Sequence, residues 1–155
     1  SPHLAAREEG RSIDRTVIHR YVTEVRRGAQ GVVVELAGGL FSPLGRALSN
    51  ADVAHDLAAD VLLLVAPDRL GVLHEAAATT RAAAGAGVIL TGIVLVAPDS
   101  PDASTGTNAA ELALVTDVPV LAIVPRAELR SLALRSDLRA LLPTPANPRP
   151  AARPL

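Results

Sequence analysis

The chain has 155 residues, of which 49% are hydrophobic and 20% are charged, and its formal net charge is −1. This composition excludes extensive disorder and predicts one globular domain, and the absence of cysteine rules out disulfides and thiolate metal sites. Near-neutral charge argues against a nucleic-acid partner, and no apolar run is long enough to span a bilayer. Without a secretion signal, a cytoplasmic location is the default expectation.

The first predicted element is an amphipathic helix over residues 12–27. Apolar residues recur in it at helical spacing, Ser12 is a candidate N-cap, and Gly28 ends it. The arginines on its outer face are interpreted as a solvated surface, so they predict no nucleic-acid contact.

Four short apolar runs rich in β-branched residues are typical of buried strands in a parallel sheet, and they cover residues 31–36, 61–66, 91–97 and 118–124. Ala- and Leu-rich segments between them predict helices over residues 49–59, 71–84 and 108–115, with Ser49, Asn50 or Asn108 as caps. The alternation predicts a three-layer α/β sandwich with a mostly parallel sheet and ligands at the carboxyl ends of the strands.

The domain is expected to extend over residues 1–142, with a last helix at 127–142. Five prolines in residues 143–155 predict an extended or disordered tail. The polar run 98–107 predicts a mobile connection.

The most informative motif is the run from Val32 to Leu44, in which a predicted strand ends at Glu35 and is followed by Gly38 and Gly39. A carboxylate at a strand end that faces a ligand crevice is suited to hold Mg²⁺, and the glycines let a substrate approach the backbone. The alternative is that Glu35 points to solvent and the glycines form only a tight turn.

In this motif and others, the chain resembles the ATP-dependent dethiobiotin synthetases of biotin biosynthesis. The run from Glu35 to Leu44 is similar to the family's VEGAGG segment with its following Ser/Thr and Pro-Leu. Further similar stretches are Ser1 to Ala6, Glu9 to Ile13, Leu70 to His74, and Val118 to Pro125. The resemblance covers nearly everything from Ser1 to about Pro125.

The resemblance implies a P-loop-NTPase-like fold and an ATP-dependent cyclo-ligase that closes a cyclic urea from 7,8-diaminononanoate and CO2. It implies that Glu35 is a Mg²⁺ ligand, and that a homodimer forms in which one subunit's 70–74 turn receives the carboxylate of the diamino acid bound by the other. The implied nucleotide-side residues are Glu35, Leu36, Ala37, Gly38, Val96, Ala97, Ile123, Val124 and Pro125. The implied substrate-binding residues are Ala37, Gly38, Gly39, Leu40, Ser42, Leu70, Gly71, Val72, Leu73 and His74.

The chain also departs from the family pattern. The family's phosphate loop and its lysines precede the stretch similar to Ser1–Ala6, and all 15 basic residues here are arginine, so a lysine amine must come from outside this chain. Leu36 replaces a glycine, and Val96 stands where the family often has an adenine-recognising Asn. We therefore expect the carboxyl-terminal portion of a dethiobiotin synthetase, inactive alone. The alternatives are a non-catalytic homologue that dimerises or binds a small acid, and an unrelated α/β module.

Overall fold

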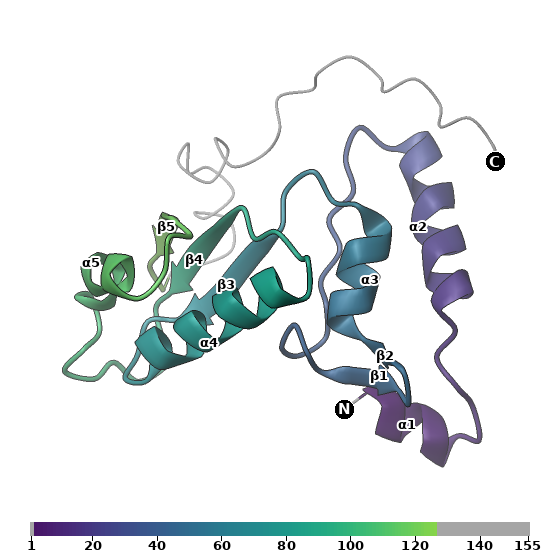
Figure 1. Cartoon of the computed structure of the whole chain (residues 1–155), viewed down its shortest axis with the longest axis horizontal. Helices are drawn as coiled ribbons and strands as arrows, with labels where there is room; N and C mark the ends of the chain where they lie inside the picture. Colours follow the sequence, from purple (N-terminus) through teal and green to yellow (C-terminus); the bar gives the residue numbers. More distant parts are fainter. Residues whose placement is uncertain (1, 127–155) are drawn as a thin grey trace.

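The computed structural model describes residues 2–126, in which an amino-terminal group of helices with a small hairpin is followed by a parallel sheet covered by helices (Figure 1). The predicted helix over 127–142 and the tail over 143–155 lie outside the described residues. No helix within residues 2–126 combines the length and apolar character needed to cross a membrane.

The sheet consists of three parallel strands in the order β3 (Leu63–Pro67), β4 (Gly92–Val96) and β5 (Val120–Val124). Leu63 pairs with Gly92, and the register continues to Pro67 against Val96. Three of the four predicted strands are therefore confirmed, each shifted by one or two residues at its start. Parallel neighbours need crossover connections, and the helices between these strands provide them.

Helix α4 (Val72–Gly85), the short α5 (Asn108–Glu111) and the 3₁₀ turn Leu112–Leu114 follow the strands. The central strand is buried along four of its five residues, because Ile93 and Leu95 pack into one cluster with helix residues. The helix residues of this cluster are Val72, Ala76 and Leu112. On β3, by contrast, Val65 is 62% exposed. The α/β class with a parallel sheet, as in P-loop-NTPase-like domains, is confirmed.

The amino-terminal region contains α1 (Pro2–Glu8), α2 (Arg15–Gly28), the antiparallel pair β1 (Pro43–Gly45) and β2 (Leu48–Ser49), and α3 (Asn50–Leu57). Of these elements, α2 and α3 were predicted from the sequence, whereas α1 and the hairpin were not. Both missed elements are short, and strands of two or three residues leave no periodic pattern to detect.

Of the four predicted helix caps, the structure corrects three and confirms one. The N-cap of α2 is Asp14, whose side chain accepts a hydrogen bond from the backbone N–H of Thr16, and Ser12 lies outside the helix. At α3, Ser49 is the N-cap in a reciprocal capping box with Asp52, as one of the predicted alternatives. Asn50 and Asn108 are not caps: each is the first residue of its helix, and both are buried.

The predicted strand over residues 31–36 is wrong for this structure. These residues form no strand and run as an extended connection from α2 past α3 (Figure 1). Val33 is 89% exposed and Val34 is 41% exposed. The physical reason is that a strand exists only through hydrogen bonds to a neighbour, and no strand among residues 2–126 pairs with this run.

Candidate functional site

The residues from Ala37 to Ser42 form a loop, called here the glycine loop, that is anchored from beneath by Asn50. The Asn50 side chain is 1% exposed, and its Nδ2 donates hydrogen bonds to the carbonyl oxygens of Ala37 at 2.9 Å and Gly39 at 3.0 Å. The backbone N–H of Ser42 donates to the Gly39 carbonyl. The start of α3 therefore holds the loop, while Gly38 and Gly39 themselves stay exposed.

Gly38 is required by the geometry of this loop, whereas Gly39 is not. The backbone of Gly38 has φ +83°, and a Cβ there would lie 2.7 Å from the Oγ of Ser42. A Cβ at Gly39 would meet nothing nearer than 3.9 Å. The absence of a side chain at Gly39 thus leaves its outer surface open for another molecule, without serving the local fold.

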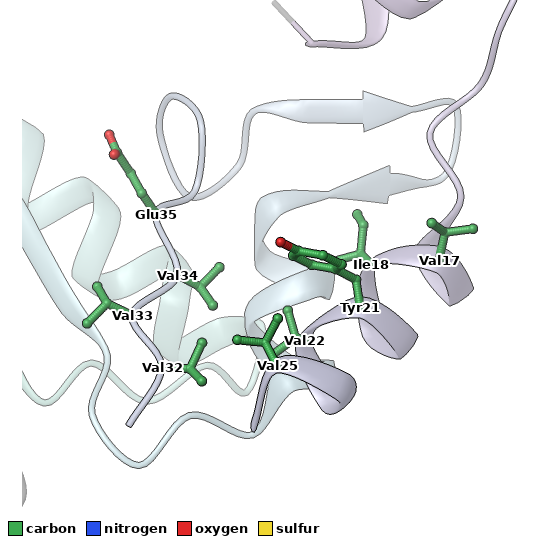
Figure 2. A pocket seen from close by; sticks show the side chains of 9 residues that line it. All are labelled: Val17, Ile18, Tyr21, Val22, Val25, Val32, Val33, Val34 and Glu35. Atoms are coloured by element: carbon green, nitrogen blue, oxygen red, sulfur yellow. The ribbon is translucent and has the colours of Figure 1, made fainter. Parts of the chain in front are cut away.

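Glu35 stands at the rim of a groove between α2 and the extended run. The groove is lined by Val17, Ile18, Tyr21, Val22, Val25, Val32, Val33, Val34 and Glu35. The carboxylate is exposed and points away from the apolar side chains (Figure 2). The prediction that Glu35 ends a buried strand is therefore wrong here, because the run lacks a paired neighbour, although the side chain does border a cleft.

A metal at Glu35 would depend on ligands from elsewhere. Among residues 2–126, no group of three His, Asp or Glu side chains converges on one point. Mg²⁺ in nucleotide sites is commonly held by one or two carboxylates, with phosphate oxygens and waters completing the shell. An exposed single carboxylate fits that donor set and does not fit a cage built from protein ligands alone.

The predicted nucleotide-side residues of β4 and β5 are brought together at the carboxyl edge of the sheet. The backbone N–H of Ala97 donates to the Val124 carbonyl at 2.9 Å, and Val96 pairs with Val124 in the register. A groove of about 640 Å³ opens at this edge, lined by Val65, Ala66, Pro67, Arg69, Val96, Ala97, Pro98, Asp99 and Ser100. Ile123 and Pro125, the sequence neighbours of Val124, are exposed. The Arg126 guanidinium forms an ion pair with the Asp99 carboxylate at 2.6 Å.

The turn from Leu70 to His74 opens α4 next to the same edge, since the N–H of Asp68 donates to the Val96 carbonyl. Gly71 is the N-cap with φ +96°, and no side chain caps this helix end. Among the described residues, the backbone N–H groups of Leu73 and His74 have no hydrogen-bond partner. Such orphan donors at a helix N-terminus favour an anion.

The glycine loop and this turn lie at opposite ends of α4. Leu36 and Leu40 pack against a cluster that contains Ala83, in the last turn of the helix. From Val72 to Ala83 an α-helix rises about 16 Å. The structure therefore unites the turn with the carboxyl edge of the sheet, but it does not bring Glu35 or the glycine loop to them within one chain.

A polar network that no sequence pattern predicted joins the turn to the loop before α5. Asp68 is 2% exposed, and its carboxylate accepts hydrogen bonds from Asn108 Nδ2 at 2.7 Å and from the N–H of Gly106 at 2.8 Å. Asp102 Oδ2 accepts from the N–H of Leu70 at 2.8 Å. The only signal in the sequence is an Asn at the start of a helix, which reads as a cap.

Hydrogen bonds lower the pKa of Asp102 to about 2, the largest effect coming from the Ser104 hydroxyl and the next from the Leu70 amide. Asp102 is therefore ionised at neutral pH. The loop 98–107, predicted as a mobile connection, is thus held by several hydrogen bonds to its neighbours.

The parallel sheet, the crossover helices and the groove at the carboxyl strand ends define the class as an α/β domain of P-loop-NTPase-like type. A family model described as an AAA domain matches residues 1–131. The chain belongs to this family.

Three curated relatives of this chain share one name. A protein of Rhodopirellula baltica named ATP-dependent dethiobiotin synthetase is 39% identical, over 80% of this chain and 52% of its own length. Proteins of the same name from Janthinobacterium sp. (strain Marseille) and Aromatoleum aromaticum are 37% and 36% identical, over 81% of this chain. The resemblance seen in the motifs is confirmed, and the chain spans about half the length of these relatives.

Proposed function

We propose that this chain is the substrate-binding portion of an ATP-dependent dethiobiotin synthetase, which closes a cyclic urea from 7,8-diaminononanoate, CO2 and ATP. The support is the identity of 36–39% to relatives of that name, together with an exposed glycine loop held in place by a buried side chain. A cytoplasmic location goes with this proposal.

In this function the glycine loop lines the diamine pocket. Ala37, Gly38, Gly39, Leu40 and Ser42 would contact the substrate mainly through backbone. A side-chain-free surface at Gly39 allows close approach of the diamine, and the bonds from Asn50 fix the loop before the ligand arrives. Binding then costs less conformational entropy, because the loop is already ordered.

The geometry supports a homodimer in which the second subunit binds the carboxylate of the substrate. The turn from Leu70 to His74 presents the partnerless amides of Leu73 and His74, yet it is about a helix length from the glycine loop of its own chain. A second copy that brings its turn to this loop would complete the pocket. The separation of the glycine loop and the turn along α4 is the observation that supports a pocket shared between two subunits.

The nucleotide would lie at the carboxyl edge of the sheet. Val96 and Ala97 would contact it from β4, and Ile123, Val124 and Pro125 from the end of β5. Glu35 and Leu36 lie toward the opposite end of α4 from this edge, so they would meet only the phosphate end of an extended nucleotide, where the Glu35 carboxylate would hold Mg²⁺. Mg-ATP would supply activation of the carbamate, and the chain's own contribution is to bind and orient the reactants.

Calorimetry with 7,8-diaminononanoate tests the pocket. Gly39→Val is expected to abolish binding and to leave the circular dichroism spectrum unchanged, because a Cβ at this position would make only an ordinary contact, at 3.9 Å from the Ser42 Oγ. Gly85→Ala, at the carboxyl-terminal end of α4 with open space around it, is the matched control and should bind like the wild type. Unchanged affinity in Gly39→Val would refute the pocket.

Mixed dimers test the shared site. Gly39→Val removes the loop half, and His74→Asp places a carboxylate beside the amides of the turn, on an exposed side chain. Neither variant alone should bind the diamine. A mixture of the two should regain one intact site per heterodimer, since the second site carries both changes. A mixture without any binding would contradict the shared pocket.

The alternative function is a non-catalytic module that dimerises or binds a small acid. It is favoured by one observation, that the 155 residues contain no lysine and no G-x-x-x-x-G-K-[ST] run, which nucleotide sites of this class use to cradle phosphates. We expect the 155-residue polypeptide to show no ATP hydrolysis. Measurable turnover by purified material would refute the claim that this portion is inactive alone.

A further inference from the structure

The β3–α4 turn is held by an unusual arrangement of buried polar groups. Asp68, at 2% exposure, has no cation within bonding distance among the described residues, and burying an unpaired carboxylate is costly. It is satisfied instead by neutral donors, the amide of Asn108 and the N–H of Gly106. Asn108 is itself 4% exposed.

The backbone of Asp68, Arg69 and Leu70, which leads into α4, is contacted by side chains of the loop 102–108. The carbonyl of Asp68 accepts from Thr105 Oγ1 at 3.0 Å, the carbonyl of Arg69 lies 3.5 Å from Asn108 Nδ2, and the N–H of Leu70 donates to Asp102. These contacts join residues 32 to 39 positions apart in the sequence. They hold the backbone as far as Leu70, before the partnerless amides of Leu73 and His74.

We propose that Asp68, Asn108 and Asp102 form a positioning clamp that fixes the turn before α4 and so sets the direction of the Leu73 and His74 amides. The inference rests on the proposed function, in which those amides receive the substrate carboxylate. The clamp residues touch neither substrate nor nucleotide: they act through the backbone of Asp68–Leu70. The held backbone also borders the groove at the carboxyl edge, because Arg69 is one of its lining residues.

An exchange of the two buried side chains separates positioning from mere stability. Asn108→Asp sets a carboxylate against the Asp68 carboxylate and removes the amide donor. Combining it with Asp68→Asn restores one donor and one acceptor across the pair but not the 3.5 Å contact with the Arg69 carbonyl, and the new amide at position 68 keeps an oxygen for the Gly106 N–H. Leu57→Ala, which opens a cavity in the core of the amino-terminal region, is a destabilised control with an intact clamp.

The first measurement is amide hydrogen exchange in the 155-residue chain. Asn108→Asp should accelerate exchange at Leu70 and Gly106 by roughly tenfold or more, while Ile93 in the sheet keeps its protection. The exchanged pair should return both amides toward the wild-type rate. Equal loss of protection at Ile93, or no change at Leu70, would overturn the clamp.

The second measurement is diamine affinity by calorimetry. Asn108→Asp should weaken binding by roughly tenfold, the exchanged pair should recover most of it, and Leu57→Ala should bind normally. A turn that opens in hydrogen exchange without any loss of affinity would overturn the positioning role. Failure of the wild type to bind the diamine would instead refute the proposed function, while the exchange rates still decide whether the clamp holds the turn.

Discussion

The two regions of the described chain treat similar apolar runs very differently. In the sheet region, the run in β4 is flanked by parallel strands on both sides, and Ile93 and Leu95 are fully buried. In the amino-terminal region, the run at 31–36 has no paired strand, and Val33 is 89% exposed. Composition and β-branching are alike in both runs. The difference teaches that a hydrophobic run becomes a buried strand only when a neighbour accepts its backbone hydrogen bonds.

The largest expected effect is at the centre of the sheet region. Ile93→Ala should reduce the free energy of unfolding by about 2–5 kcal/mol, because it leaves a cavity in a fully packed cluster. Urea denaturation checks the value. A loss below about 1 kcal/mol would mean that this region is no better packed than the amino-terminal one, and the comparison would fail.

A smaller effect is expected in the glycine loop of the amino-terminal region. Gly38→Ala should cost about 1–2 kcal/mol, since its positive φ is unfavourable for any residue with a Cβ. The new Cβ also forces the Ser42 hydroxyl to move. Gly39→Ala, one position along, should be nearly neutral in the same urea experiment. Equal losses in the two variants would show that the loop is not fixed as described.

In the sheet region, the ionised carboxylate of Asp102 makes the free energy of unfolding depend on pH. The pKa of Asp102 is about 2 in the folded chain, below its ordinary value of 3.8. Its stabilising contribution is therefore complete above pH 3.8 and is lost as the pH falls through about 2. We expect Asp102→Asn to lack this component of the acid-induced decrease in the urea midpoint.

Two carboxyl groups of the amino-terminal region respond to acid in the same direction. The pKa values of Asp52 and Asp56 are lowered, mainly by the Ser49 hydroxyl and by Arg15 respectively. The difference between wild type and Asp102→Asn isolates Asp102 from both. Parallel pH curves for the two proteins would contradict a network that depends on the ionised carboxylate.

The smallest effect is expected at the unpaired run. Val33→Ala removes two methyl groups from a side chain that is already in solvent, so the free energy of unfolding should change by less than about 0.5 kcal/mol. The urea midpoint measures this directly. A loss as large as that of Ile93→Ala would show that residues 31–36 are packed in solution, and the contrast between the regions would disappear.

Much of the sheet region was predictable from sequence. The runs at β3, β4 and β5 were predicted as strands and the segments at α3 and α4 as helices, and Ser49 was among the predicted caps. The candidate site was predictable mainly through the resemblance, which singled out the glycine loop and the turn from Leu70 to His74. It did not show how far apart they lie, because that distance depends on where the ends of α4 pack.

The roles of buried polar residues were not predictable. Asn50 and Asn108 look like caps in the sequence. In the structure, however, the Asn50 side chain donates to the Gly39 carbonyl, and the Asn108 side chain donates to the Asp68 carboxylate, 40 positions away. Asp68 looks like an ordinary turn residue until its burial is known. Such partners are brought together by folding, so no local pattern encodes them.

By itself, the sequence determined the class of fold, the order of helices and strands from residue 49 onward, and the family, because periodicity, capping and motif spacing are local properties of the chain. The tertiary structure alone decided which apolar runs are buried and which polar side chains meet. Strand pairing and the satisfaction of buried hydrogen-bonding groups depend on neighbours that are remote in sequence. For that reason Ile93 and Val33, in runs of similar composition, end in opposite environments.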